Sequence, residues 1–155
     1  MIKIFVGSSS GAKSQAKKFI EGCAHKNVKY YPWWEQFTAG ETLLETLDKI
    51  RKNIDAAVLL LTPELSSQTS KGTEFVLPNQ NVLFEFGYFY AALGKANVAI
   101  AKYGSIALPS DLGGYIHING SKFYKPGACN AVANKTRVEF DRWLDALITN
   151  GAEAK

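Results

Sequence analysis

The stretch Asp55-Ala56-Ala57-Val58-Leu59-Leu60-Leu61-Thr62 decides the fold, because six apolar residues stand in a row between polar ends. Such a run is typical of a parallel strand that is buried on both faces. Residues 2–6 have the same character and end in a Gly/Ser loop. An amphipathic helix pattern at 42–54 precedes the first run, and a second helix pattern at 81–93 follows it. We therefore expect strands and helices to alternate along the chain.

The remaining segments continue this alternation. The predicted strands span residues 2–6, 28–34, 56–61, 98–101 and 115–118, and the predicted helices span 12–24, 42–54, 81–93 and 132–148. Such βαβ units have right-handed crossovers, which place helices on both faces of a parallel sheet. The pattern favours a three-layer, flavodoxin-like α/β fold with strand order 2-1-3-4-5. The ligand crevice then lies where the first and third strands end, beside loops 7–11 and 62–81.

Composition indicates one globular domain and excludes several classes of protein. The chain has 155 residues, of which 46% are hydrophobic and 21% charged. A net charge of +4 without a long Lys/Arg run leads us to expect no nucleic-acid partner, and no apolar stretch is long enough for a membrane span. The two cysteines and two histidines lack the spacing of a disulfide framework or a metal site. We expect a reduced, cytoplasmic domain without metal or cofactor.

The loop after the first strand is a candidate binding element. Gly7-Ser8-Ser9-Ser10 offers backbone N–H groups and hydroxyls at the start of a helix, which suits a phosphate or a ribose. The loop is not a P-loop, because Ala12 stands where that motif needs glycine and the third strand ends in Thr62 rather than in an aspartate for Mg²⁺. The alternative is that a serine caps the first helix.

Glu85 is the candidate catalytic residue, because it is the one charged side chain in the apolar helix pattern 82–93. A carboxylate is rarely buried without a partner, so Glu85 binds a basic group, accepts hydrogen bonds from backbone donors as a structural carboxylate, or lines a cavity. Asn81 and Tyr88 share its helix face. A lone carboxylate suits a reaction with a cationic transition state and a leaving group that needs no proton. Cleavage of the nicotinamide–ribose bond of NAD⁺ is such a reaction.

An aromatic stretch, Tyr30-Tyr31-Pro32-Trp33-Trp34-Glu35-Gln36-Phe37, covers the end of the second strand. We expect Trp33 to pack in the core. Trp34 and Phe37 are expected in the loop, where they could stack on an adenine or nicotinamide ring or contact a partner. A neighbouring copy that ordered this loop would raise activity, so we expect a homo-oligomer. The polar segment 64–77 is predicted as a mobile flap over the crevice, although a plain connector is the alternative.

With these motifs in place, the chain resembles the bacterial TIR-like (Toll/interleukin-1 receptor) domain, the effector half of TIR–STING and TIR–SAVED antiphage proteins. The most specific match is Asn79-Gln80-Asn81-Val82-Leu83-Phe84-Glu85-Phe86-Gly87, and segments 3–10, 34–40, 57–63 and 108–114 also match. The resemblance implies an NAD⁺ glycohydrolase that releases nicotinamide and ADP-ribose, or a cyclic ADP-ribose, and that self-assembly activates. It places the catalytic role on Glu85. The candidate substrate-binding residues are Gly7, Ser8, Ser9, Ser10, Trp34, Phe37, Asn81, Tyr88 and Asp111.

Two other functions stay open. One is a non-enzymatic TIR–TIR interaction module, in which Glu85 is structural. The other is a nucleoside deoxyribosyltransferase-like enzyme, which shares the layout and a catalytic glutamate. Many TIR enzymes outside this subgroup carry an aromatic residue at the position of Asn81. Residues 1–150 are expected to form the TIR-like domain, and 151–155 a tail or the start of a linker to a fused cyclic-nucleotide sensor domain.

Overall fold

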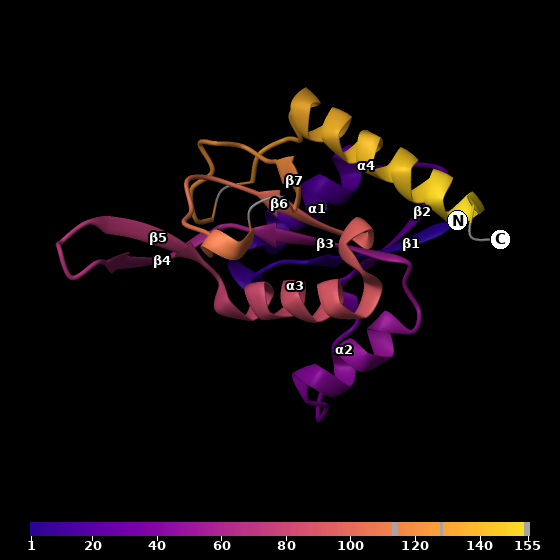
Figure 1. The fold of residues 1–155 in the computed structure, drawn as a ribbon, viewed down its shortest axis with the longest axis horizontal. Coiled ribbons are helices and arrows are strands. Elements are labelled where there is room, and N and C mark those ends of the chain that lie inside the picture. Colours follow the sequence, from indigo (N-terminus) through magenta and orange to yellow (C-terminus); the bar gives the residue numbers. More distant parts are fainter. Residues whose placement is uncertain (113–114, 128, 154–155) are drawn as a thin grey trace.

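The molecule is built on a parallel sheet of five strands. The computed structural model describes residues 1–112, 115–127 and 129–153. The strands lie side by side in the order β2 (Val28–Pro32), β1 (Ile2–Gly7), β3 (Ala56–Leu61), β6 (Val98–Lys102) and β7 (Ile116–Asn119) (Figure 1). Every pair in this sheet is parallel, which confirms the predicted α/β fold and its order 2-1-3-4-5. The direction of winding changes between β1 and β3, so a crevice is expected at their carboxyl ends.

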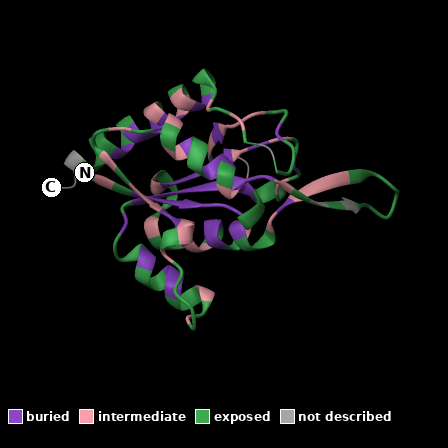
Figure 2. Cartoon of the chain, turned by 180° about the vertical axis from the view of Figure 1, so that it is seen from behind, coloured by how far each residue is buried: buried purple, intermediate pink, exposed green. Residues whose placement is uncertain are grey.

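Helices cover both faces of the sheet, which confirms the three layers. α1 (Lys13–Gly22) and α4 (Asn134–Glu153) lie on one face, and α2 (Leu43–Arg51) and α3 (Gln80–Leu93) lie on the other (Figure 1). All six residues of β3 are buried, and they alternate between the two hydrophobic clusters that these layers enclose. Figure 2 shows the buried residues gathered in the sheet and on the inner sides of the helices.

The helix ends follow local signals. α2 begins with a capping box, in which the Thr42 hydroxyl accepts a hydrogen bond from the Glu45 N–H and the Glu45 carboxylate accepts one from the Thr42 N–H. α4 continues to Glu153, into the segment 151–155 that was predicted as a tail; residues 154–155 lie outside the described chain. Among the described helices, none is long and apolar enough to cross a membrane.

The segment predicted as a structureless flap is a β-hairpin, so that prediction is wrong. β4 (Pro63–Gln68) pairs antiparallel with β5 (Glu74–Pro78). In the connecting turn the Thr69 N–H donates to the Thr73 carbonyl, and Gly72 adopts a φ of +80°, which glycine tolerates best. The hairpin adds no strand to the central sheet, as expected, and it projects away from the domain rather than over the crevice (Figure 1).

Candidate functional site

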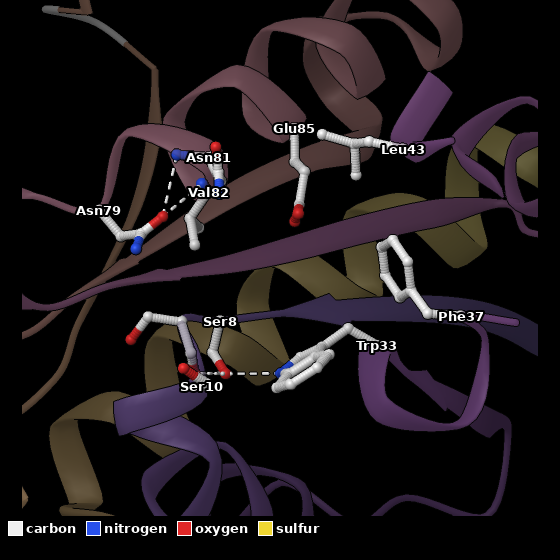
Figure 3. A pocket seen from close by; sticks show the side chains of 10 residues that line it. Ser8, Ser10, Trp33, Phe37, Leu43, Asn79, Asn81, Val82 and Glu85 are labelled. Carbon is white, nitrogen blue, oxygen red and sulfur yellow. Dashed lines mark hydrogen bonds between the residues drawn. The ribbon is translucent and has the colours of Figure 1, made fainter. Parts of the chain in front are cut away.

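A pocket opens at the carboxyl ends of β1 and β3, in the predicted crevice. Its volume is about 320 Å³, within the range of small-molecule sites. The loop after β1, the segment after β2 and the first turns of α2 and α3 supply the lining: Ser8, Ser9, Ser10, Trp33, Phe37, Leu43, Asn79, Asn81, Val82 and Glu85 (Figure 3). Glu85 is the only acid or base among these residues, so it controls the charge of the pocket.

Glu85 is buried, and no residue that the structure describes pairs with its charge. Its side chain reaches from α3 into the pocket (Figure 3), and the residue is 7% exposed. Oε2 is fully buried and has no hydrogen-bond partner among the described residues. Burial raises the pKa of Glu85 from 4.5 to about 7. Of the three uses predicted for this carboxylate, lining a cavity is therefore the one that the geometry supports.

Gly7 leaves the space that Glu85 occupies. A Cβ at position 7 would lie 2.4 Å from Leu59 Cδ1 and 3.0 Å from Glu85 Oε2. The first contact is shorter than real side chains show, and the second is tight. The last residue of β1 is thus glycine because a buried leucine and the carboxylate both approach its Cα. Gly11, at the other end of the same loop, has open space around it.

We expect Gly7→Ala to lower the free energy of unfolding by about 1–3 kcal/mol, the typical cost of overpacking a buried site. The matched control is Gly11→Ala, whose added methyl meets nothing and which we expect to change stability by less than about 0.5 kcal/mol. Denaturant unfolding of both variants measures the difference. Equal stabilities would contradict the close approach of Leu59 and Glu85 to Gly7.

The serines of the first loop are not used to cap the first helix, so that alternative is wrong. A short 3-10 turn (Ser10–Ala12) precedes α1, and the N-cap residue of α1 is Ala12. The Ser8 hydroxyl donates to the Ser9 carbonyl at 2.9 Å. The Ser9 hydroxyl is buried and has no hydrogen-bond partner among the described residues. The loop therefore presents to the pocket a hydroxyl that nothing in the described chain satisfies.

Asn79 caps α3 on the wall of the pocket that faces the serines of the first loop. Its side-chain carbonyl accepts hydrogen bonds from the N–H groups of Asn81 and Val82, at 2.9 and 3.2 Å, and so caps α3. Its amide donates to the Glu64 carboxylate at the base of the hairpin, at 2.6 Å. Asn79 was missed as a site residue, although an asparagine directly before an apolar helix is a recognisable N-cap signal.

Trp33 packs where it was predicted and also lines the pocket, whereas Trp34 lies away from it. Trp33 is partly buried against the hydrophobic cluster under α2 and α3, as expected, and its indole N–H donates to Ser8 Oγ at 2.8 Å in the pocket (Figure 3). Trp34, expected to stack on substrate, lies outside the pocket lining and packs against the cluster under α1, with the ammonium groups of Lys13 and Lys17 within 5.4 and 5.9 Å of its ring centre. The cause is a 3-10 turn (Trp33–Glu35), in which neighbouring side chains point about 120° apart.

Tyr88 and Asp111 also lie outside the lining of this pocket. The Tyr88 hydroxyl donates to the Asp48 carboxylate of α2 instead. Tyr88 is three residues beyond Glu85, about 4.5 Å further along the helix axis, where α2 covers α3. Asp111 is exposed in a 3-10 turn (Ser110–Leu112).

The structure thus brings together most of the residues predicted for the site. Around the pocket it places Ser8, Ser9, Ser10, Phe37, Asn81 and Glu85, with Gly7 against the carboxylate. That these residues bind a substrate stays a prediction. Besides Asn79, three lining residues were not predicted for the site: Leu43, Val82 and Trp33 are apolar side chains that pattern alone assigns to a core.

Comparison with known proteins finds a family whose model covers most of the chain. Residues 3–122 match the family model of the CAP12/Pycsar effector protein TIR domain, which spans every residue discussed for the site. The match confirms the TIR resemblance that the sequence motifs carried.

Individual relatives are similar at about the same level. Protein tirC of Dictyostelium discoideum is 29% identical over 131 residues, which cover 76% of this chain and 64% of that protein. A CD-NTase-associated protein 12 of Flavobacterium daejeonense is 30% identical over 152 residues, covering 96% of this chain and 47% of the relative. The Pycsar effector protein PaPycTIR of Pseudomonas aeruginosa is 29% identical over 146 residues, covering 90% and 47%. The chain spans less than two thirds of the length of each of these relatives.

Proposed function

This chain belongs to the family of CAP12/Pycsar effector TIR domains, and we propose that it cleaves the nicotinamide–ribose bond of NAD⁺. The observation that carries the proposal is the buried carboxylate of Glu85, which has no described partner and is the only ionisable group lining the pocket. Burying an unpaired carboxylate lowers the stability of the fold, so such a group indicates a function in which it meets a cation. NAD⁺ supplies one, first on the nicotinamide ring and then on the ribose.

In the proposed reaction, the bond between ribose C1′ and the nicotinamide nitrogen breaks, and the electron pair leaves with nicotinamide, which becomes neutral. Positive charge moves to the ribose as an oxocarbenium-like centre. The Glu85 carboxylate faces this centre and stabilises it electrostatically in a pocket of low polarity. Water then adds to C1′ and releases one proton, giving ADP-ribose. Attack by a hydroxyl or ring nitrogen of the same molecule would give a cyclic product instead.

The other pocket residues suit the rest of the nucleotide. The Ser9 and Ser10 hydroxyls line the pocket and would bind ribose hydroxyls or phosphate oxygens. Asn81 lies on the wall opposite Ser10 (Figure 3). Phe37 is 39% exposed, so part of its ring is free to stack on a base. Each of these groups would contribute to binding, whereas Glu85 would act on the charge that develops in the transition state.

The pKa of Glu85 sets the expected pH dependence. The ionised carboxylate is the active form, and burial raises the pKa of Glu85 to about 7 in the free protein. We therefore expect kcat/KM for NAD⁺ to rise with pH, with an inflection near 7, and then to level off. The cationic substrate lowers the pKa of the bound carboxylate, so the inflection in kcat should lie at lower pH. A kcat/KM that falls as pH rises from 5 to 8 would contradict the assignment.

We also propose that self-association activates the domain, as part of an antiphage effector. The half-exposed Phe37 stands beside the pocket, where a neighbouring copy would order the loop after β2. We expect the rate of nicotinamide release per molecule to rise as protein concentration increases a hundredfold. A constant rate per molecule would exclude assembly as the switch, and no release at any concentration would exclude cleavage by this domain in favour of a binding module.

A further inference from the structure

Trp33 joins the two loops that flank the pocket. Pro32 at the end of β2 pairs with Val6 of β1, so the residues that follow these strands emerge side by side. The Trp33 indole N–H donates to Ser8 Oγ at 2.8 Å (Figure 3). The same ring packs edge-on against Phe37, with centroids 6.3 Å apart. The Trp33 side chain thus contacts both the serine loop (residues 7–11, after β1) and the aromatic loop (residues 33–37, after β2).

A chain of hydrogen bonds continues from Trp33 to the peptide of Ser9. The Ser8 hydroxyl accepts from the indole and donates to the Ser9 carbonyl at 2.9 Å. That carbonyl also accepts from the N–H of Ala12 at 3.1 Å. Two hydrogen bonds therefore fix the orientation of the Ser9 carbonyl and hold the backbone from which the Ser9 side chain projects.

This series of hydrogen bonds ends at Ser9, whose own hydroxyl has no described partner. Ser9 is 5% exposed and lines the pocket, and its hydroxyl has no hydrogen-bond partner among the described residues. A buried hydroxyl without a partner is unfavourable by itself, so its orientation must be imposed by neighbouring bonds. The bonds that impose it begin at Trp33.

We propose that Trp33 is a positioning residue for substrate binding: it holds the serine loop so that the Ser9 hydroxyl stands ready for a sugar hydroxyl or phosphate oxygen of the dinucleotide. The proposal rests on the proposed function, whose binding step it deepens. Trp33 acts through Ser8 and Ser9, and Glu85 lies on a different element, α3. Loss of the indole donor should therefore weaken substrate binding and leave the chemical step nearly intact.

The first measurement does not depend on activity. The chain has three tryptophans, so ¹⁵N labelling gives three indole N–H signals. Ser8→Ala should shift the Trp33 signal and speed its exchange with water about fivefold or more, because one hydrogen bond of typical strength is lost. The Trp143 signal is the internal control, since its N–H donates to the Ala96 carbonyl at 2.9 Å, far from this loop in sequence. An unchanged Trp33 signal would overturn the proposal whether or not NAD⁺ is a substrate.

The second measurement separates binding from chemistry. Trp33→Phe keeps an aromatic ring and removes the donor, and we expect it to raise KM for NAD⁺ about fivefold while kcat changes less than about twofold. Ser8→Ala should raise KM by the same factor. The double variant should raise KM no more than either single variant, because each substitution breaks the same series of hydrogen bonds. Trp143→Phe is the matched control, since it also removes an indole donor, which in Trp143 bonds to the Ala96 carbonyl, and since Trp143 lies outside the pocket lining; its KM should equal that of the wild type.

The two proposals fail in different ways. Additive effects in the double variant, or an unchanged KM in Trp33→Phe, would show that Trp33 has a merely structural role. If the wild type releases no nicotinamide, the proposed function fails. The positioning role of Trp33 is then tested by a titration with NAD⁺, in which the indole N–H signals report the binding affinity. A fivefold weaker affinity in Trp33→Phe would then support it, and an equal affinity or no binding would overturn it.

Discussion

Replacement of Glu85 by glutamine is expected to lower the turnover of NAD⁺ by a factor of about 10²–10³, the typical loss when one electrostatic contact to a transition state is removed. The substitution keeps the size and shape of the side chain and removes its negative charge. Because nicotinamide leaves without needing a proton, the amide cannot compensate by donating one. KM should change much less, since the serine and aromatic groups that are proposed to bind the nucleotide are untouched.

The matched control for this substitution is Glu74→Gln, the same chemical change on the exposed hairpin, away from the pocket. Its turnover should equal that of the wild type when nicotinamide release is followed at saturating NAD⁺. If the Glu85→Gln protein keeps more than half of the wild-type turnover, Glu85 is not the catalytic carboxylate.

The same Glu85→Gln protein is expected to be more stable than the wild type at pH 8, by about 3 kcal/mol. Burial raises the pKa of Glu85 from 4.5 to about 7, so between these pH values the folded state binds more protons than the unfolded state. The stability of the wild type therefore falls as pH rises through this window and becomes level above it. A glutamine has no proton to lose, so it avoids this cost, and the advantage should nearly vanish at pH 5.

Denaturant unfolding of both proteins at pH 5 and pH 8 measures this prediction. The quantity to compare is the difference between variant and wild type at each pH, because it cancels the titration of groups that the two proteins share. Glu74→Gln should show no pH-dependent difference of this size, since its side chain is exposed. A difference that is the same at both pH values would contradict the buried, unpaired state of Glu85.

The fold could be predicted because its signals are local and strong. The continuous apolar run Ala56–Leu61 is typical of a strand buried on both faces, and five strand patterns separated by helix patterns allow few topologies. The hairpin was missed for the opposite reason. Its first strand contains Ser66 and Gln68 rather than alternating apolar residues, so only its partner strand, with Phe75 and Val76, carried a β signal.

The site could be predicted where a Gly/Ser loop follows the first strand at the crevice, as at Ser8 to Ser10, and where a residue conflicts with its surroundings. Glu85 stands out because a carboxylate in an apolar helix needs an explanation. Trp33 and Trp34 carry no such conflict, and the turn that sends them to opposite sides arises where the edge strand ends, which pattern does not reveal. The role of Gly7 depends on a contact with a helix more than seventy residues away in sequence, and it becomes visible only in three dimensions.

The most direct test of Glu85 as the carboxylate that faces the cleaved bond is the structure of the Glu85→Gln protein with NAD⁺ bound. We expect ribose C1′ to lie within about 4 Å of the side chain of residue 85. The nicotinamide ring should lie inside the pocket, with its bond to ribose C1′ intact. NAD⁺ bound elsewhere, or bound here with its nicotinamide ribose turned away from residue 85, would contradict the account.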